Sequence, residues 1–350
     1  MRIAQISPLF ESVPPRLYGG TERVVSYLTE SLVRRGHDVT LFASGDSITA
    51  AHLTSFREVA LRLDPAPFKS DLATHLSMLD AIRERAGEFD VLHFHIDLLP
   101  FPLFRKQAHK CVFTLHGRQD QQDLPQAYRR WHMFPLVSIS DHQRQPLPWA
   151  NWWRTIPHGI PTSLLRPLAR PSRDYLAFLG RISPEKRPDR AIEIARRAGM
   201  PLKIAAKVDA ADKRYFHETI EPLLASSDVE FVGEISDAGK SAFLGNAAAL
   251  LFPIDWPEPF GLVMIEAMAC GTPVIAWREG SVPEVVEEGE TGYMVDSIED
   301  AVARVREALG IDRERIRRRF EDRFDADRMA ADYEALYLDM VKGTPQRLEA

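Results

Sequence analysis

The chain has 350 residues, of which 45% are hydrophobic and 27% are charged, and its net charge is −6. This length favours two domains of about 150 to 200 residues, and the composition excludes a disordered chain. The negative net charge argues against general nucleic-acid binding. No apolar stretch is long enough to cross a bilayer, and the amino terminus does not resemble a signal peptide. Two cysteines, Cys111 and Cys270, are too few for a disulfide framework, so we expect a cytoplasmic protein.

The first part of the chain alternates short apolar runs with amphipathic segments. The predicted elements are a strand at 2–7, a helix at 22–35, and strands at 38–43, 90–95, 111–116 and 136–140. Gly36 ends the helix, whose apolar stripe includes Val24, Leu28 and Leu32. Strands separated by helices predict βαβ units and a parallel sheet.

The pattern restarts after the proline-containing run LRPLARPSR at 165–173. Strands are predicted at 175–179, 202–208, 229–232, 249–252, 274–277 and 293–295, and helices at 187–198, 213–225, 238–247, 262–269, 298–309, 312–324 and 326–340. We therefore expect two doubly wound, Rossmann-like α/β domains facing a central cleft. The expected divisions are an amino-terminal, acceptor-side domain at 1–165, a hinge at 166–173, a nucleotide-sugar domain at 174–325, and a helix at 326–350 that packs back on the first domain. The arginine run 317–319 is interpreted as a solvated helix face.

Ligands of such sheets bind beyond the carboxyl ends of the strands, so the loops there are the places to search. The first strand is followed by the loop SPLFESVPPRLYGGTE, in which Gly19 and Gly20 allow close backbone approach before a helix begins. The strand that opens the second domain is followed by GRISPEKRPD. Arg181 and Lys186 in this loop suit a diphosphate, the first as a planar fork and the second as a point charge.

The most informative segment is EPFGLVMIEAMACGTPV, beginning at Glu258. Gly261 permits a tight turn before a helix whose free amides, at residues 261–263, would stabilise a phosphate. Glu266 lies one turn inside that apolar helix, where an acidic residue needs a partner, and it could accept hydrogen bonds from a ribose. Glu258 lies just before the helix and could reach a sugar beyond the phosphates.

These three segments, YGGTE, FLGRISPEKRPD and EPFGLVMIEAMACGTPVIA, resemble those of retaining family 4 glycosyltransferases with the GT-B fold, and the likeness covers nearly the whole chain. The resemblance implies that Arg181 and Lys186 hold the donor diphosphate, Glu266 the ribose and Glu258 the transferred sugar. The further positions that it implies are Gly20 near the donor phosphate, His116 at the donor sugar, Gly261, Leu262 and Val263 in the phosphate cradle, and Lys207, Glu234 and Ile235 near the nucleotide. His93 and His95 are interpreted as structural.

The implied reaction moves a hexosyl group from a nucleoside diphosphate sugar to a hydroxyl, with the anomeric configuration retained and no metal or cofactor. UDP-glucose is the first choice of donor and GDP-mannose the second. In this family the diphosphate oxygen is expected to take the acceptor proton, so Glu258 is assigned to binding rather than attack. The alternatives are a GT-B sugar-nucleotide epimerase and a catalytically silent nucleotide-sugar binding protein.

Residues 1–165 carry a net charge of +2 and the remainder −8. Eight basic residues lie within 105–154, in or beside which are Trp131, Trp149, Trp152 and Trp153. One interpretation is a lipid-linked or anionic acceptor at the inner face of a membrane, since tryptophan favours the headgroup zone. The other is a soluble sugar or metabolite acceptor, with the tryptophans stacked on it or buried.

Overall fold

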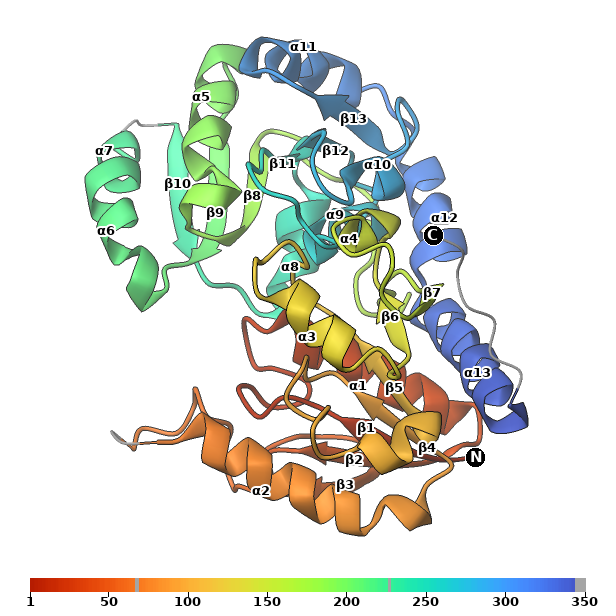
Figure 1. The fold of residues 1–350 in the computed structure, drawn as a ribbon. Helices are drawn as coiled ribbons and strands as arrows, with labels where there is room; N and C mark the ends of the chain where they lie inside the picture. The colour runs from red at the N-terminus through yellow and green to blue at the C-terminus, as the bar shows by residue number, and fades with distance from the viewer. Residues whose placement is uncertain (67–68, 226–227, 344–350) are drawn as a thin grey trace. The chain divides into compact units, whose positions relative to one another are not determined.

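The computed structural model describes residues 1–66, 69–225 and 228–343, and it divides into two compact units (Figure 1). Unit 1 consists of residues 1–159 together with the chain from Ala326 onwards. Unit 2 consists of residues 160–325. Each unit is built around one parallel β-sheet with helices packed on it, so the predicted α/β class and the doubly wound arrangement are confirmed.

The sheet of unit 1 has the strand order β3-β2-β1-β4-β5-β6-β7, and every pair is parallel. Its strands are β1 (Arg2–Ile6), β2 (Asp38–Ala43), β3 (His52–Ser55), β4 (Val91–Phe94), β5 (Cys111–Thr114), β6 (Leu136–Ser138) and β7 (Trp152–Thr155). Its helices are α1 (Gly20–Arg34), α2 (Asp71–Glu84), α3 (Leu124–Arg130), α4 (Asp141–Arg144) and α13 (Ala326–Lys342), with short 3-10 turns η1 (Ala86–Glu88) and η2 (Arg105–Lys110). The order reverses between β1 and β4, which makes the ends of these two strands the natural ligand site of the unit.

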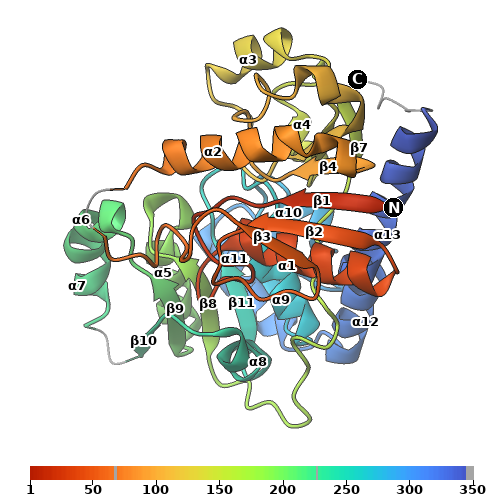
Figure 2. The same cartoon turned by 90° about the horizontal axis from the view of Figure 1, so that it is seen from below.

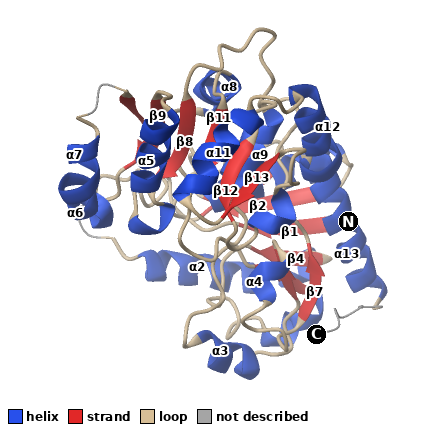
Figure 3. Ribbon diagram, turned by 90° about the horizontal axis from the view of Figure 1, so that it is seen from above, coloured by secondary structure: helices blue, strands red, loops and turns tan. Residues whose placement is uncertain are grey.

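The sheet of unit 2 has the order β10-β9-β8-β11-β12-β13, again all parallel. Its strands are β8 (Leu176–Arg181), β9 (Leu202–Lys207), β10 (Val229–Gly233), β11 (Ala249–Phe252), β12 (Val274–Trp277) and β13 (Gly292–Val295). The longer helices are α5 (Pro188–Ala198), α8 (Asp237–Gly245), α9 (Leu262–Ala269), α11 (Ile298–Ala308) and α12 (Arg313–Phe324), and the remainder are short: η3 (Pro184–Lys186), η4 (Ala210–Asp212), α6 (Lys213–Tyr215), η5 (Phe216–Ile220), α7 (Glu221–Leu223) and α10 (Val282–Val285). Figure 3 shows the strands of this sheet flanked by helices. Here the strand order reverses between β8 and β11.

Several elements are absent from the sequence prediction, including strands β3 and β7 and helices α2, α3 and α4, and one predicted helix is divided in the structure. Strand β3 was not predicted because most of it is exposed and it lacks an alternating apolar pattern; its pairing with β2 makes it a strand. The single helix predicted at 213–225 is instead α6, the π-helical turn η5 and α7. Pro222 has no amide hydrogen to donate, which disturbs the regular ladder of this segment.

The expected boundary at residues 166–173 differs from the division that the structure makes. The chain passes from unit 1 to unit 2 at Gly159, and the proline-rich segment lies inside unit 2. There the backbone amides of Arg166 and Ser172 donate to Ser241 Oγ and Asn246 Oδ1, at 3.3 and 3.0 Å. The prolines correctly indicate a segment without regular secondary structure. Hydrogen bonds to Ser241 of α8 and to Asn246 just after it hold this segment in unit 2.

Helix α13 returns the chain to unit 1 and packs against α1 (Figure 1, Figure 2). Its buried face includes Met329, Tyr333, Leu336 and Tyr337, spaced three and four residues apart as a helix stripe requires. Residues 344–350 of the expected carboxyl-terminal segment lie outside the described residues.

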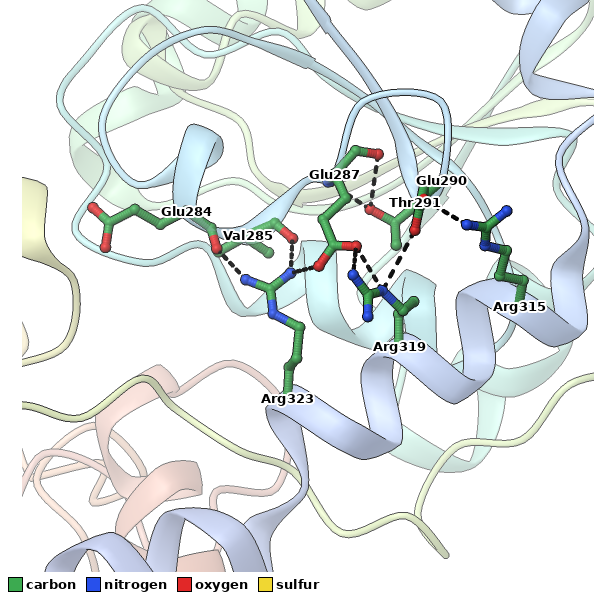
Figure 4. A network of polar contacts seen from close by, with 8 residues as sticks. All are labelled: Glu284, Val285, Glu287, Glu290, Thr291, Arg315, Arg319 and Arg323. Carbon is green, nitrogen blue, oxygen red and sulfur yellow. Dashed lines mark hydrogen bonds and ion pairs between the residues drawn. The ribbon is translucent and has the colours of Figure 1, made fainter.

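Helix α12 carries the arginine run, and its arginines bind within unit 2 more than they face solvent. Arg319 and Arg323 both pair with Glu287, and Arg323 also donates to the carbonyls of Glu284 and Val285 (Figure 4). Arg317 donates to the carbonyls of Thr162, Leu165 and Ala269 at 2.6 to 2.7 Å. The interpretation as a solvated face therefore holds for Arg318, whose side chain is 60% exposed, but not for Arg317.

Candidate functional site

The loops that follow β8 and β11 meet at the switch point of the unit 2 sheet. The backbone amide of Asp255 donates to the carbonyl of Glu185 at 2.9 Å, and Arg187 Nη1 lies 2.9 Å from Asp255 Oδ2. These contacts join the GRISPEKRPD loop to the segment that carries Glu258. Residues separated by about 70 positions in the sequence therefore share one edge of the sheet.

Lys186 and Glu258 form an ion pair at this edge. Glu258 Oε2 accepts from Lys186 Nζ and also from Trp256 Nε1, the latter at 2.9 Å. Lys186 Nζ lies 4.8 Å from the centroid of the Trp256 ring, within the range of a cation–π interaction. Both charged side chains are mostly buried, so each charge offsets the cost of removing the other from water.

Arg181 and Lys207 are register partners at the ends of β8 and β9. Arg181 pairs with Glu185 and lies 3.6 Å from both Asp209 and Asp212, while Lys207 Nζ lies 2.8 Å from Asp209 Oδ1. Burial alone would raise the pKa of Glu185, but a backbone hydrogen bond and Arg181 together lower it. Arg181 and Lys207 therefore lie side by side, and each is paired with carboxylates that an anionic ligand could replace.

Glu266 is buried in α9 and is paired with Lys240 of α8. Lys240 Nζ lies 2.6 Å from Glu266 Oε1 and 3.2 Å from Asp237 Oδ1. This cation is the partner that a carboxylate in an apolar helix requires, and the sequence prediction did not include it. Glu234 and Ile235 lie just before α8, with Glu234 exposed and Ile235 half-buried.

The start of α9 depends on a glycine. Gly261 has φ +76°, and a Cβ there would lie 2.8 Å from Met264 Cε and 3.0 Å from Phe252 Cζ. Leu262 and Val263 follow as the first helical residues, whose amides have no partners within the helix. Gly280 (φ +58°) is equally constrained, because a Cβ there would lie 2.4 Å from the backbone nitrogen and oxygen of Glu258. The sequence does not show that Gly280 has a left-handed backbone or that it packs against the backbone of Glu258, so this contact was not predicted.

In unit 1 the predicted glycine loop leads into α1, which begins at Gly20. A Cβ on Gly19 would lie 2.7 Å from Pro15 Cβ, so the close approach concerns the first glycine of the pair. Glu22 in the first turn of α1 is buried, and this burial raises its pKa to about 7.

His116 lies two residues beyond the end of β5, close to two other histidines. Its Nε2 lies 2.9 Å from His95 Nδ1, and its ring stacks on His158 with centroids 5.2 Å apart. Burial lowers the pKa of His116 to about 3 and those of His93 and His95 well below the usual value, so all three are neutral near pH 7. His93 and His95 are buried in the hydrogen-bond network of the sheet.

The four tryptophans in or beside the basic segment differ in their environments. Trp152 is buried and donates to the carbonyl of Leu147, and Trp131 packs against Phe101 in the core of unit 1. Trp153 is half-buried, whereas Trp149 is 39% exposed, and the guanidinium of Arg129 lies 4.8 Å from the Trp149 ring centroid. One exposed tryptophan therefore accompanies the exposed cations, including Arg105, Arg129 and Arg130.

Comparison with known proteins gives the class of this chain. The profile of "Glycosyltransferase Family 4" matches residues 18–164, and that of "Glycosyl transferases group 1" matches residues 166–323. A phosphatidyl-myo-inositol mannosyltransferase of Mycobacterium leprae is 27% identical over 86% of this chain and 85% of its own length. A D-inositol 3-phosphate glycosyltransferase of Acidothermus cellulolyticus is 26% identical over 81% of this chain and 76% of its own.

Solved structures agree on the architecture. A sucrose-phosphate synthase of Thermosynechococcus elongatus has a TM-score of 0.77 at 20% identity and covers 98% of this chain and 99% of its own. The Anabaena protein HepE, solved with UDP and glucose, has a TM-score of 0.73 at 18% identity and covers 96% and 98%. The chain belongs to the family 4 glycosyltransferases and has the GT-B fold. Within the described ranges, no helix is both long and apolar enough to cross a bilayer.

Proposed function

We propose that this glycosyltransferase transfers a hexosyl group from a nucleoside diphosphate sugar to a hydroxyl, with retention at the anomeric carbon and without a metal ion. The observation that carries the proposal is the constellation at the β8–β11 switch point, where Lys186 pairs with Glu258 just before α9 and Arg181 pairs with Glu185 of the same loop as Lys186. Cations and helix amides oppose the charge that develops on a diphosphate leaving group. Two cations and a helix terminus can supply this stabilisation without a metal.

The carboxylate of Glu258 is suited to binding rather than to attack. Its Oε2 already accepts hydrogen bonds from Lys186 and Trp256, and these bonds disperse the charge of the carboxylate and so weaken it as a nucleophile. We therefore assign Glu258 to a hydroxyl of the donor sugar, Glu266 to the ribose, and the acceptor proton to an oxygen of the departing diphosphate. His116 is assigned to the donor sugar and Gly20 to the donor phosphate. Lys207, Glu234 and Ile235 would lie along the nucleotide.

The donor is proposed to be UDP-glucose or a close relative, with GDP-mannose as the second candidate. The printed name of the Mycobacterium leprae relative specifies mannosyl transfer, which supports including the second donor in any assay. Thermal shifts with UDP, GDP and ADP would rank the bases, because a ligand at 100 times its Kd adds about 2.7 kcal/mol of stability. Equal shifts for all three nucleotides would leave the base to be decided by turnover.

One assay separates transfer from the two rival functions. The purified protein is incubated with each donor, with and without a panel of sugar, inositol and lipid acceptors, and products are resolved by chromatography. A transferase forms a new glycoside only when an acceptor is present. An epimerase alters the sugar without an acceptor, and a silent binding protein leaves the donor intact while still giving a thermal shift.

Two further measurements address the mechanism. Proton NMR of the first product formed gives the anomeric configuration, and an inverted product would contradict retention. Turnover in the presence of EDTA is expected to equal turnover with added Mg²⁺. A rate that disappears with EDTA and returns with a divalent cation would overturn metal independence.

A further inference from the structure

A chain of buried hydrogen bonds runs through the sheet of unit 1 to His116. It consists of Gln5 on β1, His93 and His95 on or just after β4, and Tyr337 on α13. Their burial is complete or nearly so, because Gln5, His93 and Tyr337 are 0% exposed and His95 is 3% exposed. A buried network with all donors matched to acceptors has a definite direction.

The amide of Gln5 sets that direction. Its Nε2 donates to Tyr337 Oη at 3.1 Å, and its Oε1 lies 2.8 Å from His95 Nε2. A carbonyl oxygen can only accept, so His95 must carry its proton on Nε2. Because His95 is neutral, its Nδ1 then has a lone pair.

The same reasoning passes to His116. His95 Nδ1 and His116 Nε2 are 2.9 Å apart, and with a lone pair on the first, the second must donate. Neutral His116 therefore has its proton on Nε2 and a lone pair on Nδ1. Among the described residues, His116 Nδ1 is buried and has no hydrogen-bond partner.

The other branch of the chain is consistent with this assignment. Tyr337 Oη accepts from Gln5 and lies 2.6 Å from His93 Nδ1, to which it can give its own proton. His93 Nε2 then donates to Thr114 Oγ1 at 2.7 Å, and Thr114 lies 2.7 Å from Tyr333 Oη. Both tyrosines come from α13, so the helix that returns to unit 1 ends the network.

We infer that Gln5 is a positioning residue that, through His95, fixes His116 as the tautomer protonated at Nε2, so that Nδ1 offers a lone pair to a hydroxyl of the donor sugar. The consequence for catalysis rests on the proposed function, whereas the tautomer is a property of the chain without any ligand. Reversing the Gln5 amide would reverse every donor along the chain and leave an N–H at Nδ1 instead. The identity of the tautomer is therefore a decisive observable.

The test is ¹⁵N NMR of the histidine rings in the full-length protein near pH 7. The chain has 11 histidines, and the signals of His116 are assigned by their loss in His116→Gln. We expect a protonated Nε2 and an unprotonated Nδ1. The reverse pattern in the wild-type protein would overturn the inference.

Two variants then test the role of Gln5. Gln5→Met keeps the volume but removes the acceptor for His95, so both tautomers of His116 should become populated and kcat should fall about twofold to tenfold as the competent fraction falls. Thr114→Val is the matched control, because it cuts the network beyond His93 and should leave the His116 tautomer unchanged. A tautomer that survives Gln5→Met, or that shifts equally in Thr114→Val, would contradict the role of Gln5. If His116→Gln leaves transfer unaffected while the tautomer is as inferred, the proposed role of His116 at the donor fails and the inferred tautomer stands.

Discussion

Glu258 and Glu266 lie in one segment of the chain, yet each is held by a different cation. Lys186 pairs with Glu258 at the edge of the sheet, and Lys240 pairs with Glu266 inside the fold. Replacing each carboxylate should therefore change a different quantity, nucleotide affinity for Glu266 and turnover for Glu258. Glu266→Gln should raise the Kd of the bare nucleoside diphosphate about tenfold or more, since bonds to a charged group are each worth about 1.5 to 3 kcal/mol. Glu258→Gln should mainly lower kcat with the complete donor.

Isothermal calorimetry with the bare nucleoside diphosphate measures the first effect, and steady-state kinetics measures the second. Each variant serves as the control for the other, because both replace a mostly buried, lysine-paired glutamate with the same amide. Equal losses of nucleotide affinity would contradict the separate roles.

Arg181 and Lys186 should each contribute to the transition state through the diphosphate. Replacing either with alanine is expected to lower kcat/KM by roughly 2 to 4 kcal/mol of transition-state stabilisation. The control is Arg214→Ala, because Arg214 is an exposed arginine of unit 2 that pairs with Glu218 one helical turn away. Wild-type kinetics in both the Arg181 and Lys186 variants would show that the phosphates bind elsewhere.

Glu22 makes stability depend on pH. Burial raises its folded-state pKa to about 7 from the usual 4.5 of a glutamate, so the folded protein holds a proton more tightly than the unfolded chain. The tighter binding of this proton adds to the free energy of unfolding below about pH 4.5, and the added stability is lost as pH rises to about 7. Glu22→Gln, which is neutral at every pH, should therefore be more stable than wild type at pH 8, by about 3 kcal/mol from a shift of this size.

Thermal denaturation of wild type and Glu22→Gln at pH 4 and pH 8 checks this expectation. The two melting temperatures should nearly coincide at pH 4 and separate at pH 8. A constant difference at both values would show that Glu22 titrates normally in the folded state.

At the scale of elements, α12 shows that neighbouring arginines can have opposite environments. Arg317 is 13% exposed on its side chain and binds three backbone carbonyls, whereas Arg318 faces solvent. Arg317→Met should lower the free energy of unfolding by about 2 to 4 kcal/mol because buried acceptors lose a charged donor. Arg318→Met should change it by less than about 0.5 kcal/mol. Calorimetric scans of both proteins make the comparison, and equal melting temperatures would contradict it.

At the scale of the whole molecule, the exposed side chains of unit 1 lead to a prediction about the acceptor. Exposed Arg105, Arg129 and Arg130 lie in the same unit as exposed Trp149. Each cation near an anionic surface contributes about 1 kcal/mol, and tryptophan favours the headgroup zone. The membrane proposal therefore expects co-sedimentation with anionic vesicles that weakens from low to physiological salt.

Neutral vesicles and the Trp149→Ala variant are the controls for that measurement. Loss of binding in the variant at low salt would assign the contact to this surface. The absence of binding to anionic vesicles at either salt would remove the membrane from the account and leave a soluble acceptor.

The sequence by itself determined the fold class, most elements of both sheets and the family. Apolar periodicity marks α1 and α11, and short β-branched runs mark strands such as β2 and β12 closely, because these signals are local. The segments from Arg181 and from Glu258 onwards were recognisable because their glycines, prolines and charges are adjacent in the chain. Each of these patterns can be recognised from a few residues that are neighbours in the sequence.

Only the tertiary structure decided which residues are the interaction partners of the site and network side chains. Lys240 reaches Glu266 across 26 positions, Gly280 fits against the backbone of Glu258, and Gln5 contacts Tyr337 across 332 positions. The same holds for the passage between units at Gly159 and for the return of α13. Buried charges and directed hydrogen bonds need complementary groups at one place in space, and sequence periodicity carries no information on which distant residue supplies them.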